Sequence, residues 1–577
     1  MSEHSARSGR SRSRPWWTLL PPAWTITAAA SVAYLIAAPP SPDLAAAGYR
    51  SYLFSHAGFT LWDNSWYGGH HLLAYSVLAP ALGALLGPQP LAAISMVIAT
   101  ALFAILVRGC FAARPARVAA AWFALGASVA LLSSRVPFDL GLAVGLAAAL
   151  AAQRRRLAPA LALSVLCALA SPVAGAFAGL AFLAWALAGG ERAWASALAL
   201  ASLAPIGALA LAFPEGGTQP YVASAFYPEL AGVLAIAALI ESAPAARAAH
   251  AARTAALYAG AGGLGSRAAA RTARALSLLR VGLALYALAL IGSYLLPTAV
   301  GGNVDRLGAI AAGPVAACAL VDATRLRRIA LAALAPLLLY WQANAPVADF
   351  AAAASDPSVH ASYYAPLLGE LRALGVGYGA RPVRIEVVAT ADHWEARWVA
   401  AHAMIARGWE RQLDTYRNGL FYGGRALTPA RYRAWLARNA ISYVALPDAP
   451  LDYSAKAEAR LVRAGPPYLR EVWRSAHWRL FAVRHATPLA QAPARLLAAT
   501  SDSLTLYAPR PGSYTVRVRF TPYWQLQRAF GAPGGADGCV SEGPEGWTEL
   551  GVRRAGRVRL AISFSLARVL ADGPRCS

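Results

Sequence analysis

Long apolar runs alternate with short polar stretches from the N-terminus to about residue 345. Each run has roughly 17 to 25 residues, which is enough for a helix to cross a bilayer. Beyond residue 345 charges of both signs appear, the apolar runs shorten and no spanning segment remains. The pattern predicts a polytopic α-helical membrane protein with about 11 transmembrane helices and a C-terminal region outside the membrane.

Basic residues gather in every second loop, and this alternation gives the chain an orientation. Arg-rich loops face the cytoplasm, because positive charge is retained on that side. We therefore expect residues 1–16 to be a basic cytoplasmic N-terminus and residues 17–345 to be the transmembrane domain. The first outer loop is expected at residues 39–71, and the chain after the last span is expected on the exocytoplasmic face of a plasma (inner) membrane.

The C-terminal region divides into two patterns. In residues 346–487, the strand-like runs RIEVVAT, ISYVALPD and WRLFAVRH alternate with helix-like runs, which predicts an α/β domain. Residues 488–577 carry only strand-like runs and turns, which predicts an antiparallel sheet or β-sandwich. This region holds two cysteines, Cys539 and Cys576, which could form a disulfide in an oxidising exterior.

The formal net charge of +24 first suggests a nucleic-acid partner. Arginine accounts for nearly all of it, since the chain has one lysine, Lys456. A GC-rich genome and the retention of Arg-rich loops explain this bias better, so we expect no nucleic acid among the partners. The sequence is 58% hydrophobic, and only 14% of it is charged, against about 25% in soluble chains.

The first outer loop carries more polar and aromatic residues than a simple connection needs. Asp43 follows the first apolar run at PPSPD, where prolines stiffen the backbone. A carboxylate beside aromatic rings is suited to deprotonate an acceptor hydroxyl, although a solvated loop acid is the simpler alternative. Asp63 is a second candidate for this catalytic role. The other loop residues expected at a substrate site are Trp66, Tyr67, His70 and His71.

This order of features resembles the GT-C type of integral membrane glycosyltransferases. The resemblance covers about residues 15–345, and the stretch WYGGHHLLAYSVLAPAL is similar to bacterial GT-C-like membrane proteins of unassigned substrate. It implies transfer of a sugar from a polyprenyl-phosphate donor to a cell-envelope glycan or lipid, with a catalytic Asp in the first outer loop. Asp43 matches that position best. The adjacent acidic pair typical of the family is missing, which leaves the choice between Asp43 and Asp63 open.

Arginines on the outer side are few and could hold the donor phosphate. Arg306 stands where a span begins, beside Gly301 and Gly302, which would let a ligand approach the backbone. Arg135 lies in a second outer loop. Arginine binds phosphate through paired hydrogen bonds, although Arg306 could instead pair with Asp305 or with a lipid headgroup.

The stretch ADHWEARW in the expected α/β domain is the last candidate site. Trp394, Trp409 and Glu410 could form a lip that faces the substrate, Glu395 is a further candidate to bind it, and ordinary packing is the alternative. Asp392, His393 and Glu395 could hold a metal, but their spacing matches no usual ligand set. A divalent cation is therefore possible, and no other cofactor is expected.

Two other functions remain open from the sequence. A multi-pass transporter would place polar groups in mid-membrane, where few are found, and a non-catalytic GT-C-like protein of envelope assembly would share the fold. The stretch GAGGLG at residues 260–265 matches a dinucleotide-binding pattern but follows no strand, so we reject that function.

Overall fold

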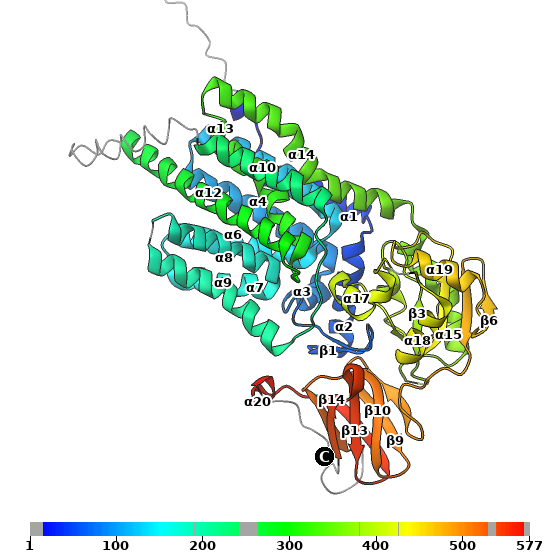
Figure 1. Ribbon diagram of the computed structural model, residues 1–577. Helices are drawn as coiled ribbons and strands as arrows, with labels where there is room; N and C mark the ends of the chain where they lie inside the picture. The colour runs from blue at the N-terminus through cyan, green and yellow to red at the C-terminus, as the bar shows by residue number, and fades with distance from the viewer. Residues whose placement is uncertain are drawn as a thin grey trace, which may run out of the picture.

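The computed structural model shows a bundle of long helices followed by two smaller regions at one end of it (Figure 1). α14 (Arg325–Ala354) runs from the bundle into the first of these regions. We call this end of the bundle the domain end. The described residues are 16–189, 191–241, 264–379, 381–424, 426–528 and 538–570.

Seven helices among the described residues are long and apolar enough to cross a membrane, so the protein is a multi-pass membrane protein. An eighth span is added if α1 (Ala23–Ala37) and α2 (Pro42–Ala57), which meet at a bend of 76°, count as one. The seven are α14 together with α4 (Pro88–Cys110), α5 (Ala113–Ala130), α6 (Val136–Gln153), α9 (Arg192–Ala212), α10 (Ala223–Glu241) and α12 (Leu264–Leu295).

The expected number of about 11 spans is not confirmed, because several apolar runs form shorter helices. α7 (Leu157–Ala170) has 14 residues, and α8 (Pro172–Leu187) and α13 (Asp305–Leu320) have 16 each. Such helices are about 21 to 24 Å long, less than the roughly 30 Å of a hydrocarbon core. Between α7 and α8, Ser171 accepts a hydrogen bond from the backbone N–H of Ala174 and starts a new helix.

The segment expected as the first outer loop begins with a helix. Ser41 caps α2 by accepting a hydrogen bond from the backbone N–H of Leu44 at 3.3 Å, and Pro42 takes the first helical position. Asp43 follows in the first turn, where its charge is favourable to the helix dipole. The prolines that we interpreted as stiffening a loop therefore start a helix instead.

Three of the helices that start at the domain end have an aspartate in the first turn: Asp43 in α2, Asp139 in α6 and Asp305 in α13. Arg135 immediately precedes α6, and Arg306 follows Asp305. The polar positions that are scattered along the sequence are therefore gathered at one end of the bundle.

The first C-terminal region has a five-stranded mixed sheet, which confirms its predicted α/β character. The strands lie in the order β4 (Met404–Ile405), β3 (Arg384–Val387), β5 (Ile441–Pro447), β7 (Trp478–Val483) and β6 (Leu469–Arg474). β4, β3 and β5 are parallel, and the remaining pairs are antiparallel. The helices include α15 (Ala361–Ala373), α16 (Glu395–Trp398), α17 (Arg411–Arg417), α18 (Pro429–Arg438) and α19 (Lys456–Arg463).

The second C-terminal region is a β-sandwich. One sheet has the order β10 (Gly512–Arg519), β13 (Trp547–Val552), β12 (Gly538–Glu542). The other has the order β11 (Trp524–Arg528), β14 (Gly556–Ile562), β9 (Ser503–Ala508), β8 (Arg495–Ala499). Apolar residues of both sheets share one core. Cys539 lies in β12, and Cys576 is outside the described residues, so the disulfide stays a prediction.

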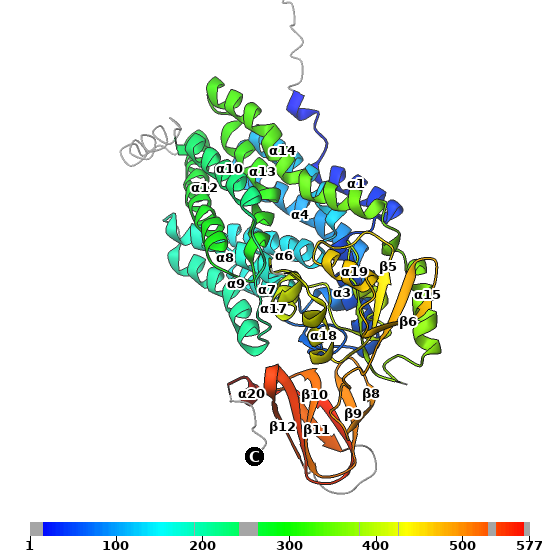
Figure 2. The ribbon, with the colours of Figure 1, turned by 45° about the vertical axis from the view of Figure 1, so that its right-hand side comes forward.

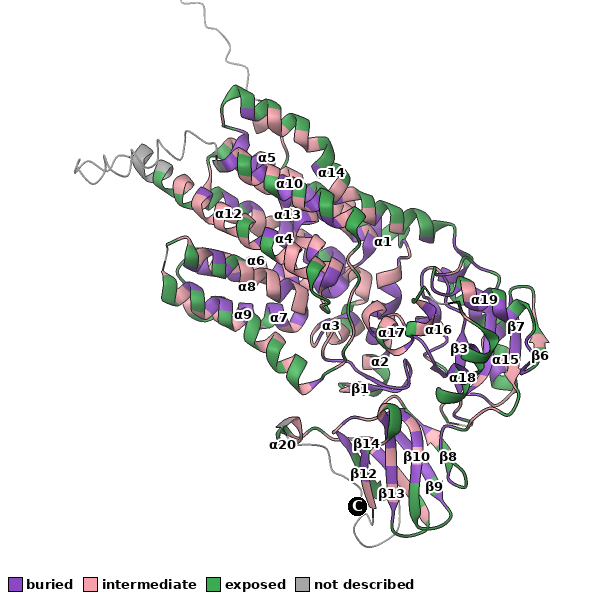
Figure 3. Ribbon diagram, viewed as in Figure 1, coloured by how far each residue is buried: buried purple, intermediate pink, exposed green. Residues whose placement is uncertain are grey.

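A small hairpin joins all three parts of the molecule. It consists of β1 (Trp62–Asp63), β2 (His70–His71) and the turn between them, and we call it the joint hairpin. Every residue from 62 to 71 is buried (Figure 3), although the polar and turn-forming residues of this stretch are typical of a solvent-exposed loop. The surrounding domains, and not the hairpin itself, bury these residues.

Hydrogen bonds connect the joint hairpin to both C-terminal regions. On the sandwich side, the backbone N–H of Asn64 donates to the carbonyl oxygen of Ser501 at 2.7 Å. On the α/β side, the indole N–H of Trp66 donates to the carbonyl oxygen of Ala396 at 3.1 Å. The joint hairpin therefore holds the domains against the bundle.

A substitution at Gly69 tests how tightly the joint hairpin is packed. Its φ is +119°, and a Cβ there would collide with the ring of Trp62. We expect Gly69→Ala to lower the apparent melting temperature of the full chain in detergent, because backbone strain of about 1–3 kcal/mol adds to the clash. Gly58→Ala is the matched control, since its φ of +72° is also unfavourable but nothing lies within 4 Å of its Cβ. Equal losses in both variants would show that the Trp62 contact is unimportant.

Candidate active site at the domain end of the bundle

A cavity of about 420 Å³ lies between the bundle and the α/β region. Its lining combines apolar and polar side chains. The apolar ones come mainly from α6, α8 and the end of α9, and these include Phe138, Val173, Ala176, Ile206, Leu209, Ala210 and Phe213. The polar ones come from several elements and the segments between them: His71, Tyr75, Glu215, Asn303, Arg306, Glu410 and Gln412. An elongated ligand with a polar head and an apolar tail fits such a cavity.

Arg306, one of the residues that line this cavity, is a cation without a protein partner among the described residues. Its guanidinium carbon lies 5.6 Å from the centre of the Phe138 ring, and it makes no hydrogen bond or ion pair with any part of the chain that the structure describes. The neighbouring Asp305 instead accepts a hydrogen bond from the indole N–H of Trp341. Arg306 is therefore available to an anionic group in the cavity.

Asp43 does not itself line this cavity, but it forms an ion pair with Arg135, which together with Arg306 lines a smaller cavity. The guanidinium Nε of Arg135 donates to Oδ2 of Asp43 at 3.2 Å. Within the described ranges, Oδ1 of Asp43 has no hydrogen-bond partner and stays free to accept a proton. The ion pair with Arg135 therefore orients the Asp43 carboxylate through one oxygen and leaves the other oxygen without a hydrogen bond to any described residue.

Tyr75 connects Asp43 with Arg306. Burial, followed by the nearby Asp43 carboxylate, raises the pKa of Tyr75 to about 12, while the charges of Arg50 and Arg306 act in the opposite direction. Tyr75 also lines the cavity. The Asp43 carboxylate and the Arg306 guanidinium are therefore both close enough to Tyr75 to influence its pKa.

A second, smaller cavity of about 30 Å³ lies behind Phe138 and Arg306. Arg135, Asp139 and Asp305 also line it. The space admits one or two water molecules, not a substrate. No group of three or more His, Cys, Asp or Glu side chains suited to a metal ion occurs in the described part of the chain, and the possible divalent cation stays a prediction.

Asp63 lies away from the cavity, in the interior of the joint hairpin. It accepts hydrogen bonds from the Tyr49 hydroxyl and from the backbone N–H of Ser65, both at 3.0 Å. Burial raises the pKa of Asp63 to about 6, although these hydrogen bonds oppose the shift. Asp63 therefore has a structural role, and Asp43 is the better candidate for a base.

Trp66, Tyr67 and His70 also differ from expectation, because they pack between domains and do not line the cavity. The Trp66 ring stacks on Tyr49 and on His70, with ring centres 4.8 and 5.3 Å apart. Burial lowers the pKa of His70 well below its usual value, so the imidazole is neutral. These aromatic residues hold domains together instead of binding a sugar.

His71 is the one residue of this group that reaches the cavity. Its Nε2 lies 3.0 Å from the Thr521 hydroxyl of the sandwich, and its Nδ1 lies 2.7 Å from Oε1 of Glu215. Glu215 also accepts a hydrogen bond from the backbone N–H of His71. His71 thus fixes the loop between α9 and α10 at the cavity wall.

Of the residues expected to bind substrate in this region, Trp394 and Glu395 are buried and do not line the cavity, whereas Glu410 does. Glu395 accepts a hydrogen bond from the Thr390 hydroxyl at 2.6 Å. Burial acts to lower the pKa of His393, but hydrogen bonds to Asp452 and Glu395 outweigh it and raise the value to about 9. The ADHWEARW stretch therefore belongs to a packed polar network.

Sequence reasoning did not connect Arg50 with Glu410. Their side chains form a buried ion pair that connects α2 to the start of α17. The guanidinium carbon of Arg50 lies 3.9 Å from the centre of the Tyr75 ring. The two residues are 360 positions apart, and no local pattern signals such a pair.

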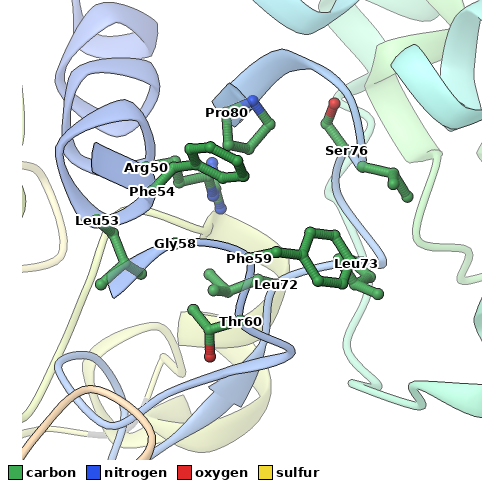
Figure 4. Close-up of a pocket in the computed structure, with 11 residues that line it drawn as sticks. Arg50, Leu53, Phe54, Gly58, Phe59, Thr60, Leu72, Leu73, Ser76 and Pro80 are labelled. Atoms are coloured by element: carbon green, nitrogen blue, oxygen red, sulfur yellow. The ribbon is translucent and has the colours of Figure 1, made fainter. Parts of the chain in front are cut away.

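Arg50 also borders a third cavity, between α2 and α3 (Ala79–Leu86) (Figure 4). Leu53, Phe54 and Phe59 are among its mostly apolar walls. Its volume of about 20 Å³ leaves room for about one water molecule. The larger cavity at Arg306 is therefore the candidate active site.

No protein-family model and no curated protein matches the sequence. Among solved structures, the chain is similar to the oligosaccharyltransferase of Archaeoglobus fulgidus, crystallised with a tethered acceptor peptide. The identity is 14%, the TM-score is 0.38, and the match covers 75% of this chain and 69% of the other. Because the likeness is distant, the function proposed below depends on the cavity.

The pKa of Asp63 predicts a pH-dependent stability. Its folded-state pKa is raised, so protonation of Asp63 favours folding and this contribution is lost as the pH rises through about 6. We expect the melting temperature of Asp63→Asn, relative to the wild type, to increase between about pH 4 and about pH 6 and to level off above. Asp502→Asn, at a half-buried loop position next to Ser501, is the control. A pH-independent difference for Asp63→Asn would contradict the burial argument.

Proposed function

We propose that the protein transfers a sugar from a polyprenyl-phosphate donor to a hydroxyl-bearing acceptor of the cell envelope. One observation carries the proposal: the partner-free guanidinium of Arg306 lines a cavity whose other lining residues are mostly apolar. The resemblance of the first outer segment to GT-C glycosyltransferases agrees with it. The domain end would face the exterior and the N-terminus the cytoplasm, as the alternation of Arg-rich loops requires.

The donor would bind with its phosphate on Arg306. A guanidinium forms two parallel hydrogen bonds to phosphate, and the low dielectric of the cavity strengthens them. The first isoprene units would lie along Val173, Ile206 and Leu209 of α8 and α9. The apolar lining of the cavity comes mainly from bundle helices, so the remainder of the tail can continue into the bilayer.

Transfer would use Asp43 as the base. Its free Oδ1 removes the proton of an acceptor hydroxyl, whose oxygen attacks the anomeric carbon of the sugar. The bond between that carbon and the phosphate oxygen breaks, and the electron pair leaves with the polyprenyl phosphate. Arg306 stabilises the negative charge that develops on the leaving group. Attack opposite the leaving group inverts the anomeric carbon.

The distribution of charge argues against the transporter alternative. Asp139, Glu229 and Asp349 all lie in the parts of α6, α10 and α14 nearest the domain end. A transporter places its ionisable groups near the middle of the membrane, on broken helices. A site at one end of the bundle is suited to chemistry at the membrane surface.

The direct test is transfer of radiolabelled sugar from polyprenyl-phosphate donors in membranes that carry the full-length protein. We expect Arg306→Ala to reduce the rate by about 10- to 100-fold, the effect of losing a charged hydrogen bond. We expect Asp43→Asn to reduce it by about 10²- to 10⁴-fold, because the general base is lost. Arg306→Lys keeps the charge and should restore only part of the rate.

Asp63→Asn is the matched control, since it removes the other acidic candidate of the same segment. It should retain transfer at an equal protein level. Unchanged transfer in Asp43→Asn, or loss in Asp63→Asn alone, would overturn the assignment of the base. A wild-type protein that transfers no sugar from any donor would contradict the function itself.

A further inference from the structure

The β-sandwich is attached to the last turn of a membrane helix by aromatic rings. Phe213, which follows α9, lies 5.5 Å from the ring centre of Tyr523 and 6.0 Å from that of Phe564. The Tyr523 hydroxyl donates a hydrogen bond to the carbonyl oxygen of Ala212, the last residue of α9, at 2.5 Å. This end of the sandwich is thus held at the depth where the α9 span ends.

An open cleft of about 460 Å³ adjoins these rings, and we call it the edge cleft. The bundle side contributes Phe59, Leu73 and Phe213, and the sandwich contributes Ile562 and Phe564. Apart from Thr60 and Asp502, the residues that line it are apolar. Soluble domains rarely expose a contiguous apolar surface of this kind to water, so another apolar group normally covers it.

The exposed apolar residues around the edge cleft continue the lipid-facing surface of the bundle. Phe59, Phe564 and Leu566 are 60%, 47% and 75% exposed, respectively. Leu211, in the last turn of α9, is 75% exposed, and only 22% of the apolar window of that span is buried within the protein. Figures 1 and 2 both show α20 (Leu566–Leu570) beside the domain end of α9.

We propose that the β-sandwich rests on the bilayer through this edge, with acyl chains of the leaflet at the domain end filling the edge cleft. The exposed Leu211 at the end of α9 is followed closely by Phe213, whose ring contacts that of Phe564, so the same lipid can cover α9 and the sandwich edge. Aromatic side chains favour this interfacial depth. The sandwich is then a membrane-contacting domain that carries the joint hairpin at a fixed height above the lipid.

The test replaces Phe564 or Phe59 of the full-length protein with benzoylphenylalanine. On illumination this residue forms a covalent bond to whatever lies next to it, whether a lipid acyl chain or a protein. The protein is placed in vesicles of phosphatidylcholine and phosphatidylglycerol that contain tritiated phosphatidylcholine. The control is Tyr507, an aromatic residue of β9 that is 41% exposed but does not line the edge cleft. If the Phe564 protein is not produced, Leu566 takes its place.

We expect tritium on the protein labelled at Phe564 and at Phe59, and only background label at Tyr507. Equal label at Phe564 and Tyr507 would overturn the proposal, as would a cross-link from Phe564 to a second protein. An excess of unlabelled undecaprenyl phosphate should leave the label unchanged. A loss of label with that lipid would show that the edge cleft holds a prenyl chain, and would overturn the assignment to bilayer lipid.

Discussion

The joint hairpin is the constraint on which the arrangement of this molecule depends. Ten consecutive positions, 62 to 71, are buried between the bundle, the α/β region and the sandwich. Its backbone and side-chain donors are paired with Ser501 and Ala396, so separation of the domains would leave buried polar groups without partners. That cost, about 1–3 kcal/mol for each group, makes the three parts one unit.

The cavity follows from this arrangement. The bundle supplies Arg306 and most of the apolar lining, and the α/β region supplies Glu410 and Gln412. The buried ion pair of Glu410 with Arg50 holds the two contributions together, and removal of one partner would leave an uncompensated buried charge. A site assembled in this way combines charged groups with the apolar surfaces of bundle helices, as the proposed lipid-linked substrate needs.

Local pattern is sufficient to predict much of the fold. Long apolar runs identify the spans, because a helix must bury its backbone groups within itself in lipid. Alternating runs identify β5, β7 and the sandwich strands, because each has one face in a core. The start of α2 is missed, since the prolines at Pro40 and Pro42 are equally compatible with a rigid loop and with a helix N-terminus.

The candidate site is predictable only in part. Asp43, Arg135 and Arg306 are found from sequence because each flanks the end of an apolar run, and such ends meet at a membrane surface. The burial of Asp63 and Trp66 away from the cavity is not predictable, since a polar or aromatic loop residue has the same local pattern whether it faces solvent or a distant domain. The partner of Trp66, Ala396, is 330 positions away in the chain.

The measurement that tests the central claim most directly is lipid retention by the purified full-length protein in native mass spectrometry. Undecaprenyl phosphate is compared with uncharged undecaprenol for the wild type, Arg306→Ala and Asp63→Asn. We expect the wild type and Asp63→Asn to prefer the phosphorylated lipid, and Arg306→Ala to bind both lipids equally, because the free guanidinium provides the preference. A preference that persists in Arg306→Ala would contradict the assignment of the cavity as a polyprenyl-phosphate site.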